Sequence, residues 1–172
     1  MIADLERWHD FYLLVGTAGA TLLALLFVAV SLGVGFLTEE KAPATRTFYS
    51  PIIIHFASVF FISAIALVPA HGSRFFAALI GITALIGAMI SAFITVELVR
   101  RKWTQYVRDY LAYGLLPAAG YLALFVAAVT IYKELDIALD VLAGALLLLL
   151  LINVRNTWDL MLSMVRHQTG RH

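Results

Sequence analysis

The sequence predicts an all-α fold, a polytopic membrane helix bundle of bacterial type with about five transmembrane helices. Hydrophobic residues make up 62% of the 172 residues and charged residues only 13%, about half the charged fraction of a typical soluble domain. Five apolar runs follow one another, and no polar stretch is long enough for a separate soluble domain. We therefore expect residues 1–172 to form a single transmembrane domain in the cell (inner) membrane. Its predicted spans lie at about 11–37, 51–70, 75–96, 111–132 and 137–154.

The first apolar run, residues 11–37, carries no charge and exceeds the about 20 helical residues that cross a bilayer. The residues before it are net acidic and the run is too long for a signal-peptide core, so we expect it to be retained. Small and hydroxylated residues recur on one face at steps of three and four: Thr17, Thr21, Ala24, Val28, Ser31 and Gly35. This stripe predicts either a dry helix-packing seam or the lining of a pathway.

The second and third spans are expected to form an antiparallel hairpin. The polar segment 38–50 is typical of a loop, and Pro51 suits the first turn of the second span, 51–70. The short segment HGSR then predicts a tight turn before the third span, 75–96. That span carries its own stripe of small and hydroxylated residues, Thr83, Gly87, Ser91 and Thr95. We expect this stripe to pack against the stripe of the first span.

The fourth span, 111–132, contains Pro117 between two glycines. An interior proline removes one backbone hydrogen bond, so this position predicts a bend. A short polar turn leads to the fifth span, 137–154. No glycine or proline follows that span until close to the C-terminus, so we expect its helix to continue as an amphipathic extension over 155–167. The third helix is expected to have a similar extension over 97–110.

The basic residues of the polar segments predict the orientation of the chain. With five spans, nine of the 12 Lys and Arg residues fall on the side that holds the segments after the first and third spans and the C-terminus. The other side holds the remaining three. The positive-inside rule therefore places the N-terminus outside and the C-terminus in the cytoplasm. Both amphipathic extensions are then cytoplasmic.

The extension of the third helix carries a basic cluster, Arg100, Arg101, Lys102 and Arg108. Because the cluster lies at a predicted membrane boundary, we expect it to contact anionic lipid headgroups rather than nucleic acid. Trp103 and Trp158 lie on the apolar faces of the two extensions. We expect these faces to pack against each other or against a partner.

His55 is the one ionisable side chain well inside a predicted span, and Ser58 and Ser63 follow it on the same helix. Ionisable groups are costly in a bilayer and histidine changes charge near neutral pH, so a proton relay or pH gate is one interpretation. The other is a structural histidine about one turn inside the helix end, bonded to a carbonyl or water. The candidate residues for a pathway or packing seam are thus Thr17, Thr21, Ser31, His55, Ser58, Thr83 and Ser91.

Motifs for catalysis, cofactor binding and metal binding are absent from the sequence. The five histidines form no HExxH pattern, and there is no Walker loop, nucleophile elbow or dinucleotide fingerprint. The lack of cysteine excludes disulfides and thiolate metal sites. We therefore predict no catalytic residue, no cofactor and no metal ligand, which disfavours an enzyme.

Three functions remain as hypotheses. The first is a homo-oligomeric channel or small transporter, favoured by the hydroxylated stripes and by His55. The second is a non-catalytic accessory or scaffold subunit that binds another membrane protein through the extensions. The third, a membrane-embedded lipid-modifying enzyme, ranks last because such chemistry needs converging polar groups.

Overall fold

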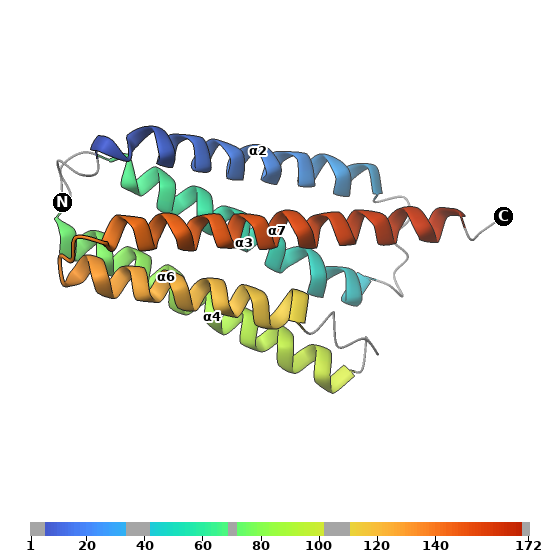
Figure 1. Ribbon diagram of the computed structural model, residues 1–172. Helices are drawn as coiled ribbons and strands as arrows, with labels where there is room; N and C mark the ends of the chain where they lie inside the picture. Colours follow the sequence, from blue (N-terminus) through green and yellow to red (C-terminus); the bar gives the residue numbers. More distant parts are fainter. Residues whose placement is uncertain (1–5, 34–41, 69–71, 102–110, 170–172) are drawn as a thin grey trace.

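The computed structural model describes residues 6–33, 42–68, 72–101 and 111–169, with side chains for 6–31, 51–68, 72–100 and 111–162. Within these residues the chain is helical and contains no strand, which confirms the all-α prediction. The long helices lie side by side as a bundle (Figure 1). They are α2 (His9–Gly33), α3 (Ala42–Ala66), α4 (Ser73–Arg101), a π-helical turn η3 (Leu111–Leu115), α6 (Leu116–Tyr132) and α7 (Ala138–Thr169).

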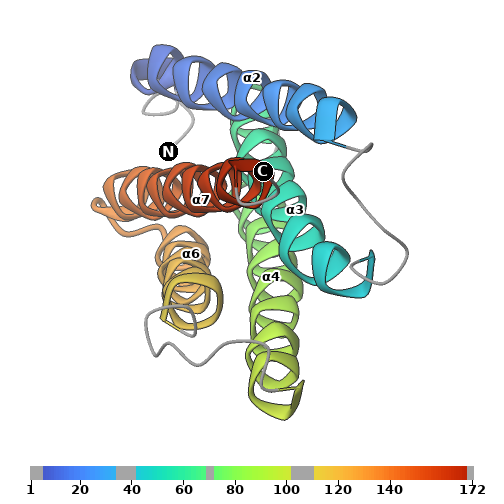
Figure 2. The ribbon, with the colours of Figure 1, turned by 90° about the vertical axis from the view of Figure 1, so that its right-hand side faces the viewer.

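Four of the helices form a ring around a common axis. α4 packs on α6, α6 on α7, α7 on α3, and α3 on α4, as the end-on view in Figure 2 shows. α2 lies outside this ring, against α3 and, to a smaller extent, α7. α3 and α6 therefore face each other across the axis, and side chains that join them cross the centre of the bundle.

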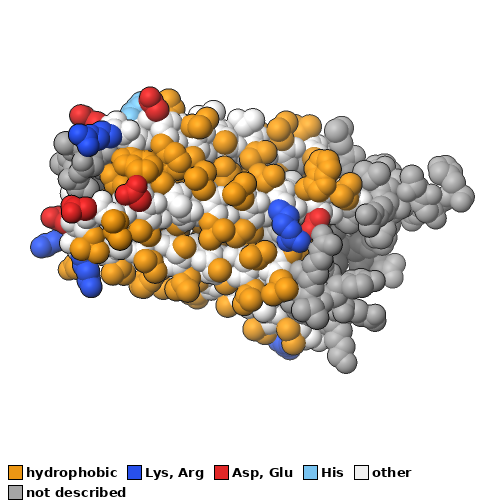
Figure 3. All heavy atoms as spheres, in the orientation of Figure 1, with side chains coloured by type: hydrophobic (Ala, Val, Ile, Leu, Met, Phe, Trp, Pro, Cys, Tyr) orange, Lys and Arg blue, Asp and Glu red, His pale blue; other side chains and the backbone are white. Residues whose placement is uncertain are grey.

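The surface of the bundle suits a membrane. Among the described residues, apolar side chains cover its length, and Figure 3 shows many of the described charged side chains at the end where α2 begins. In the described part of the chain, four helical segments are long and apolar enough to cross a bilayer: His9–Ser31, Ser73–Arg100, Leu111–Tyr132 and Ala138–Leu162. These helices support a membrane location. The second predicted span corresponds to a shorter apolar stretch, Pro51–Ala66, within α3.

The start of α3 corrects one prediction. The helix begins at Ala42, so Pro51 lies inside it and does not start it. A proline suits the first turn of a helix. In a helix interior it removes one backbone N–H donor, and its ring lies close to the carbonyl four residues earlier, but a 25-residue helix tolerates this loss. The predicted loop 38–50 was therefore wrong from residue 42 onward.

Other boundaries lie close to those expected. α4 continues past the apolar span to Arg101, and the rest of the predicted extension, 102–110, lies outside the described residues. α7 runs without a break through residues 155–167 to Thr169. Residues 34–37 of the first predicted span also lie outside the described part of the chain.

Pro117 produces a π turn where the sequence predicted a bend. It lies in the first turn of α6, directly after the π turn Leu111–Leu115. Because proline cannot donate a backbone hydrogen bond, the wider π turn accommodates the break in the ladder. Gly114 in this turn lies so close to Thr95 of α4 that a Cβ there would overlap the threonine side chain. The glycine thus allows close contact between the π turn and α4.

The predicted seam between the first and third spans is wrong. α2 packs on α3, with Gly16 against Ser63 and Gly19 against Val59. Thr17, Thr21 and Ser31 are exposed on the outer side of α2. A stripe of small residues identifies a face suited to packing, but many faces in this chain qualify, and periodicity does not choose among them.

Candidate functional site

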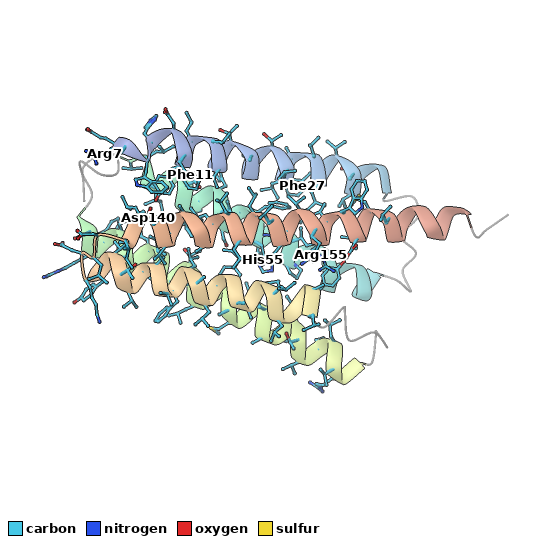
Figure 4. The ribbon with its side chains drawn as sticks, viewed as in Figure 1. Arg7, Phe11, Phe27, His55, Asp140 and Arg155 are labelled. Carbon is cyan, nitrogen blue, oxygen red and sulfur yellow. The ribbon has the colours of Figure 1, made fainter. Side chains whose placement is uncertain are left out.

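His55 is the centre of a polar site inside the ring. Its side chain is 1% exposed, and its Nδ1 shares a 2.7 Å hydrogen bond with the hydroxyl of Tyr121 on α6. α3 and α6 face each other across the ring, so this bond spans the axis of the bundle. Figure 4 shows His55 between the ends of the molecule, with Arg7 and Asp140 at one end and Arg155 toward the other.

The site lies halfway along the apolar helices. Tyr121 is ten residues from Leu111 and eleven from Tyr132, the ends of its candidate span. At about 1.5 Å per residue, each end is roughly 15 Å away. The structural interpretation of His55 placed it one turn inside a helix end, and this depth is wrong. The error follows from the start assigned to α3, because that helix begins thirteen residues before His55.

Ser58, one of the candidate residues for a pathway or packing seam, completes the network. The Tyr121 hydroxyl donates to Ser58 Oγ at 3.2 Å, and Ser58 donates to the carbonyl of Ile54 at 2.8 Å. The imidazole and phenol rings also lie in contact, with centroids 5.2 Å apart. Three polar side chains from two helices thus meet in the interior of the bundle.

The network has two hydrogen-bonded forms with the same number of protons. In one, the Tyr121 hydroxyl donates to Ser58 and accepts from Nδ1–H of His55, so Nε2 carries a lone pair. In the other, the hydroxyl donates to Nδ1, and Nε2–H is a donor. Nε2 is therefore the atom whose role changes between the two forms. It is also the atom of this site that has no hydrogen-bond partner.

Gly87 fixes the position of the Tyr121 ring. A Cβ at residue 87 of α4 would overlap the Cδ1, Cε1 and Cζ atoms of that ring. At Gly120, the residue of α6 that precedes Tyr121, a Cβ would lie 2.6 Å from Leu149 of α7. The two glycines let α6 approach α4 and α7 closely enough for Tyr121 to reach the axis. The face of α4 that contains Gly87 therefore packs against α6.

Further buried polar atoms without partners lie on both sides of His55. On the side where α2 begins they are Tyr12 Oη and Ser63 Oγ, and on the side of the π turn they are Thr157 Oγ1 and both amide atoms of Asn153. Such atoms cost on the order of 1–3 kcal/mol each when water cannot reach them. Among the described side chains, these unpartnered polar atoms are spread along the length of the bundle.

Asn156 has a different, structural role. Its Nδ2 donates to the carbonyl of Ala112 in the π turn at 2.8 Å, and the Tyr113 hydroxyl donates back to the carbonyl of Asn156 at 3.3 Å. Arg155 and Asp159, on the adjoining face, form an i,i+4 ion pair at 3.4 Å. The first two bonds hold the π turn against α7.

The remaining predicted candidates do not join the site. Thr83 and Ser91 of α4 each donate to a carbonyl of their own helix, at 2.8 and 2.9 Å, while Thr17, Thr21 and Ser31 face outward. Arg100 is exposed near the end of α4. The side chains of Arg101, Lys102, Arg108 and Trp103 lie outside the described residues. Trp158 is 65% exposed and lies on the outer side of α7.

Two residues of the site are not among the predicted candidates. Nothing local in the sequence marks Tyr121 as the partner of a histidine 66 residues away. Asn153 does carry a signal, because it interrupts an apolar segment that begins at Ile137. Primary amides are costly in such a setting, so this position is a candidate polar site.

The described residues contain no group of three His, Asp or Glu side chains arranged to hold a metal ion. Neither the protein-family models, nor the curated proteins, nor the solved structures compared with this chain match it. The fold and the site therefore define its class: an all-helical bundle, suited by its apolar helices to a membrane, with a polar network on its axis.

Proposed function

We propose that the protein is a small membrane channel or transporter that moves protons, with His55 on the pathway. The observation that carries this proposal is the position of His55: buried, on the bundle axis, halfway along the apolar helices, and with Nε2 unpartnered. A structural histidine at this depth would be expected to satisfy both ring nitrogens, because each unmet one is costly in an apolar interior.

The chemistry of the imidazole suits proton transfer. An imidazole ring can take up a proton on one nitrogen and release one from the other. Nδ1 leads to Tyr121 and Ser58, whose hydroxyls each accept and donate. Nε2 remains available for exchange. Intramembrane groups of this kind commonly form proton relays in pumps and transporters.

The other unpartnered polar atoms support a route along the bundle. Ser63 lies eight residues after His55 on α3, about 12 Å along the helix, and Gly16 of α2 packs directly against it. Tyr12 lies one turn before Gly16, near the end where α2 begins. An accessory subunit held only by packing would have no use for unpartnered polar groups at these depths.

The proposed topology has five spans, namely the four candidate spans and, in addition to them, α3. Its 25 residues are long enough to cross a bilayer although its apolar part is short. The excess of basic residues then places the N-terminus outside and the C-terminus in the cytoplasm. Arg100 at the exposed end of α4 would meet anionic headgroups there.

We also propose that the protein forms homo-oligomers through α2. That helix lies outside the ring and exposes Thr17, Thr21 and Ser31. Small and hydroxylated residues permit close contact between helices in lipid.

Proton flux into liposomes tests the function. Purified protein is reconstituted into vesicles containing a pH-sensitive dye, and a potassium gradient with valinomycin drives protons inward. We expect flux from the natural protein and, for His55→Ala, a rate equal to that of protein-free vesicles. Ser91→Ala is the matched control, because Ser91 is equally buried but bonds only to its own helix. Equal flux from His55→Ala and the natural protein, or no flux from either between pH 5 and 8, would rule the proposal out.

A further inference from the structure

The buried face of α7 changes character at the depth of the histidine. Residues on this face follow one another at steps of four and three, and all are buried: Leu142, Leu146, Leu149, Asn153, Asn156 and Leu160. The first three are leucines and the next two are asparagines. An apolar helix face that turns polar inside a membrane bundle marks the part that faces polar groups or water.

The two asparagines differ in their bonding. Asn156 holds the π turn through Ala112. Asn153 is 0% exposed, and neither its Nδ2 nor its Oδ1 has a partner. A primary amide offers two donor hydrogens and two acceptor lone pairs. Thr157, one turn further along α7, also has an unpartnered hydroxyl.

Neighbouring contacts place Asn153 near the depth of the histidine site. Gly120, which precedes Tyr121, lies against Leu149 and Ile152 of α7, and Asn153 directly follows Ile152. From the other side, Leu150 of α7 packs on the cluster that contains Ile52 and Phe56 of α3, which lie three residues before and one residue after His55. The unpartnered amide and the unpartnered Nε2 thus lie on two packed helices, at similar depth.

Water is the ligand whose chemistry fits both groups. A water molecule donates twice and accepts twice, so it serves an amide and an imidazole nitrogen in either tautomer, and buried waters typically make about three hydrogen bonds to such groups. A metal cation fits less well, because it needs several oxygen ligands and cannot use the amide nitrogen. Thr157 extends the same polar face toward the C-terminal end of α7.

We propose that a water-filled inlet runs along α7 from the π-turn end of the bundle, past Thr157 and Asn153, to Nε2 of His55. Protons, as hydronium or by hopping along the waters, enter and leave through this inlet. The identity of the species that moves, the proton, rests on the proposed function. The inlet itself is a property of the structure and can be measured without a flux assay.

The chain contains no cysteine, so single cysteines report water access directly. Asn153→Cys and Leu149→Cys are made separately in the otherwise natural protein in vesicles. Leu149 is the matched control, since it lies one turn away on the same face and is also 0% exposed. Ag⁺, which reaches thiols through narrow aqueous paths, is added. Protected thiols are then counted by mass spectrometry, after unfolding and alkylation.

We expect Ag⁺ to protect Cys introduced at 153 and to leave that at 149 free for alkylation. Equal protection of both thiols, or of neither, overturns the inlet. Asn153→Leu supplies a second measurement: proton flux should fall to the background level, while the midpoint of thermal unfolding stays the same or rises. A lower midpoint with unchanged flux would show a structural asparagine and refute the inlet.

The outcomes separate the two proposals. If flux depends on His55 but Ag⁺ does not distinguish the two thiols, the proton function stands and the inlet is wrong. If Ag⁺ protects only the thiol at 153 but the natural protein passes no protons, the inlet stands and the proton function is wrong.

Discussion

Replacement of Gly87 by alanine tests whether the Tyr121 ring is held at the bundle axis by its contact with α4. A Cβ at this position would overlap three atoms of the phenol ring, and these atoms belong to a rigid group that cannot bend aside. Either the ring rotates away from His55 or α4 and α6 separate. Added volume in a packed core typically costs about 1–3 kcal/mol, and loss of the Tyr121 hydrogen bond to buried His55 adds about 1–3 kcal/mol.

We therefore expect Gly87→Ala to lower the free energy of unfolding by about 2–6 kcal/mol, measured by denaturant titration in detergent micelles. Gly81→Ala is the matched control on the same helix. A Cβ there would lie 3.7 Å from Ala128, an ordinary contact, so that change should be neutral or stabilise the helix by up to about 1 kcal/mol.

A double-mutant cycle attributes the cost to the ring. In a Tyr121→Ala background, the space beside residue 87 is open, and Gly87→Ala should cost no more than Gly81→Ala does. The reasoning is refuted if Gly87→Ala is as mild as Gly81→Ala in the natural protein. It is refuted equally if the full cost persists after the ring has been removed.

Three other changes probe buried polar side chains of the bundle. Tyr121→Phe keeps the ring but removes its hydroxyl; we expect a loss of about 1–3 kcal/mol in unfolding free energy and a lower proton flux in vesicles. Asn156→Leu leaves the Ala112 carbonyl without its donor, and we expect a similar loss of stability, with solvent exchange of the π-turn amides accelerated in hydrogen-exchange mass spectrometry. Ser63→Ala removes an unpartnered hydroxyl, so the midpoint of thermal unfolding should stay constant or rise. A clear fall in that midpoint would show that the Ser63 hydroxyl forms a stabilising hydrogen bond.

Composition and hydropathy were sufficient to predict the helical class and most helix positions. The ends of α6 and the continuation of α7 past its apolar part follow from local patterns, because turns and the lack of stop signals act within a few residues. Pro51 shows the limit of such rules. Whether a proline starts a helix or lies inside it depends on whether the preceding residues gain enough from helical structure to offset one lost hydrogen bond.

The site was predictable only in part. His55 and Ser58 were identified because an ionisable group within an apolar run is unusual in any context, and their separation places them on one face. Tyr121 is a partner from another helix, and its selection among seven tyrosines depends on Gly87 and Gly120, which allow α6 to pack closely. Contacts among three helices depend on how the whole bundle packs, and the local spacing of residues in the sequence does not predict them.

The position of the site bears on how a pathway would be built. A channel lined by the hydroxylated stripe of α2 would need Thr17, Thr21 and Ser31 to face a pathway between subunits. In the structure these residues point outward from α2, whereas His55 points into the ring of α3, α4, α6 and α7. The exposed face of α2 and the interior of the ring are thus separate surfaces of one subunit. Under the proposed function, a route through His55 lies within one subunit, and contacts through α2 would join subunits that each carry their own route. Proton flux per subunit should then be independent of the oligomeric state.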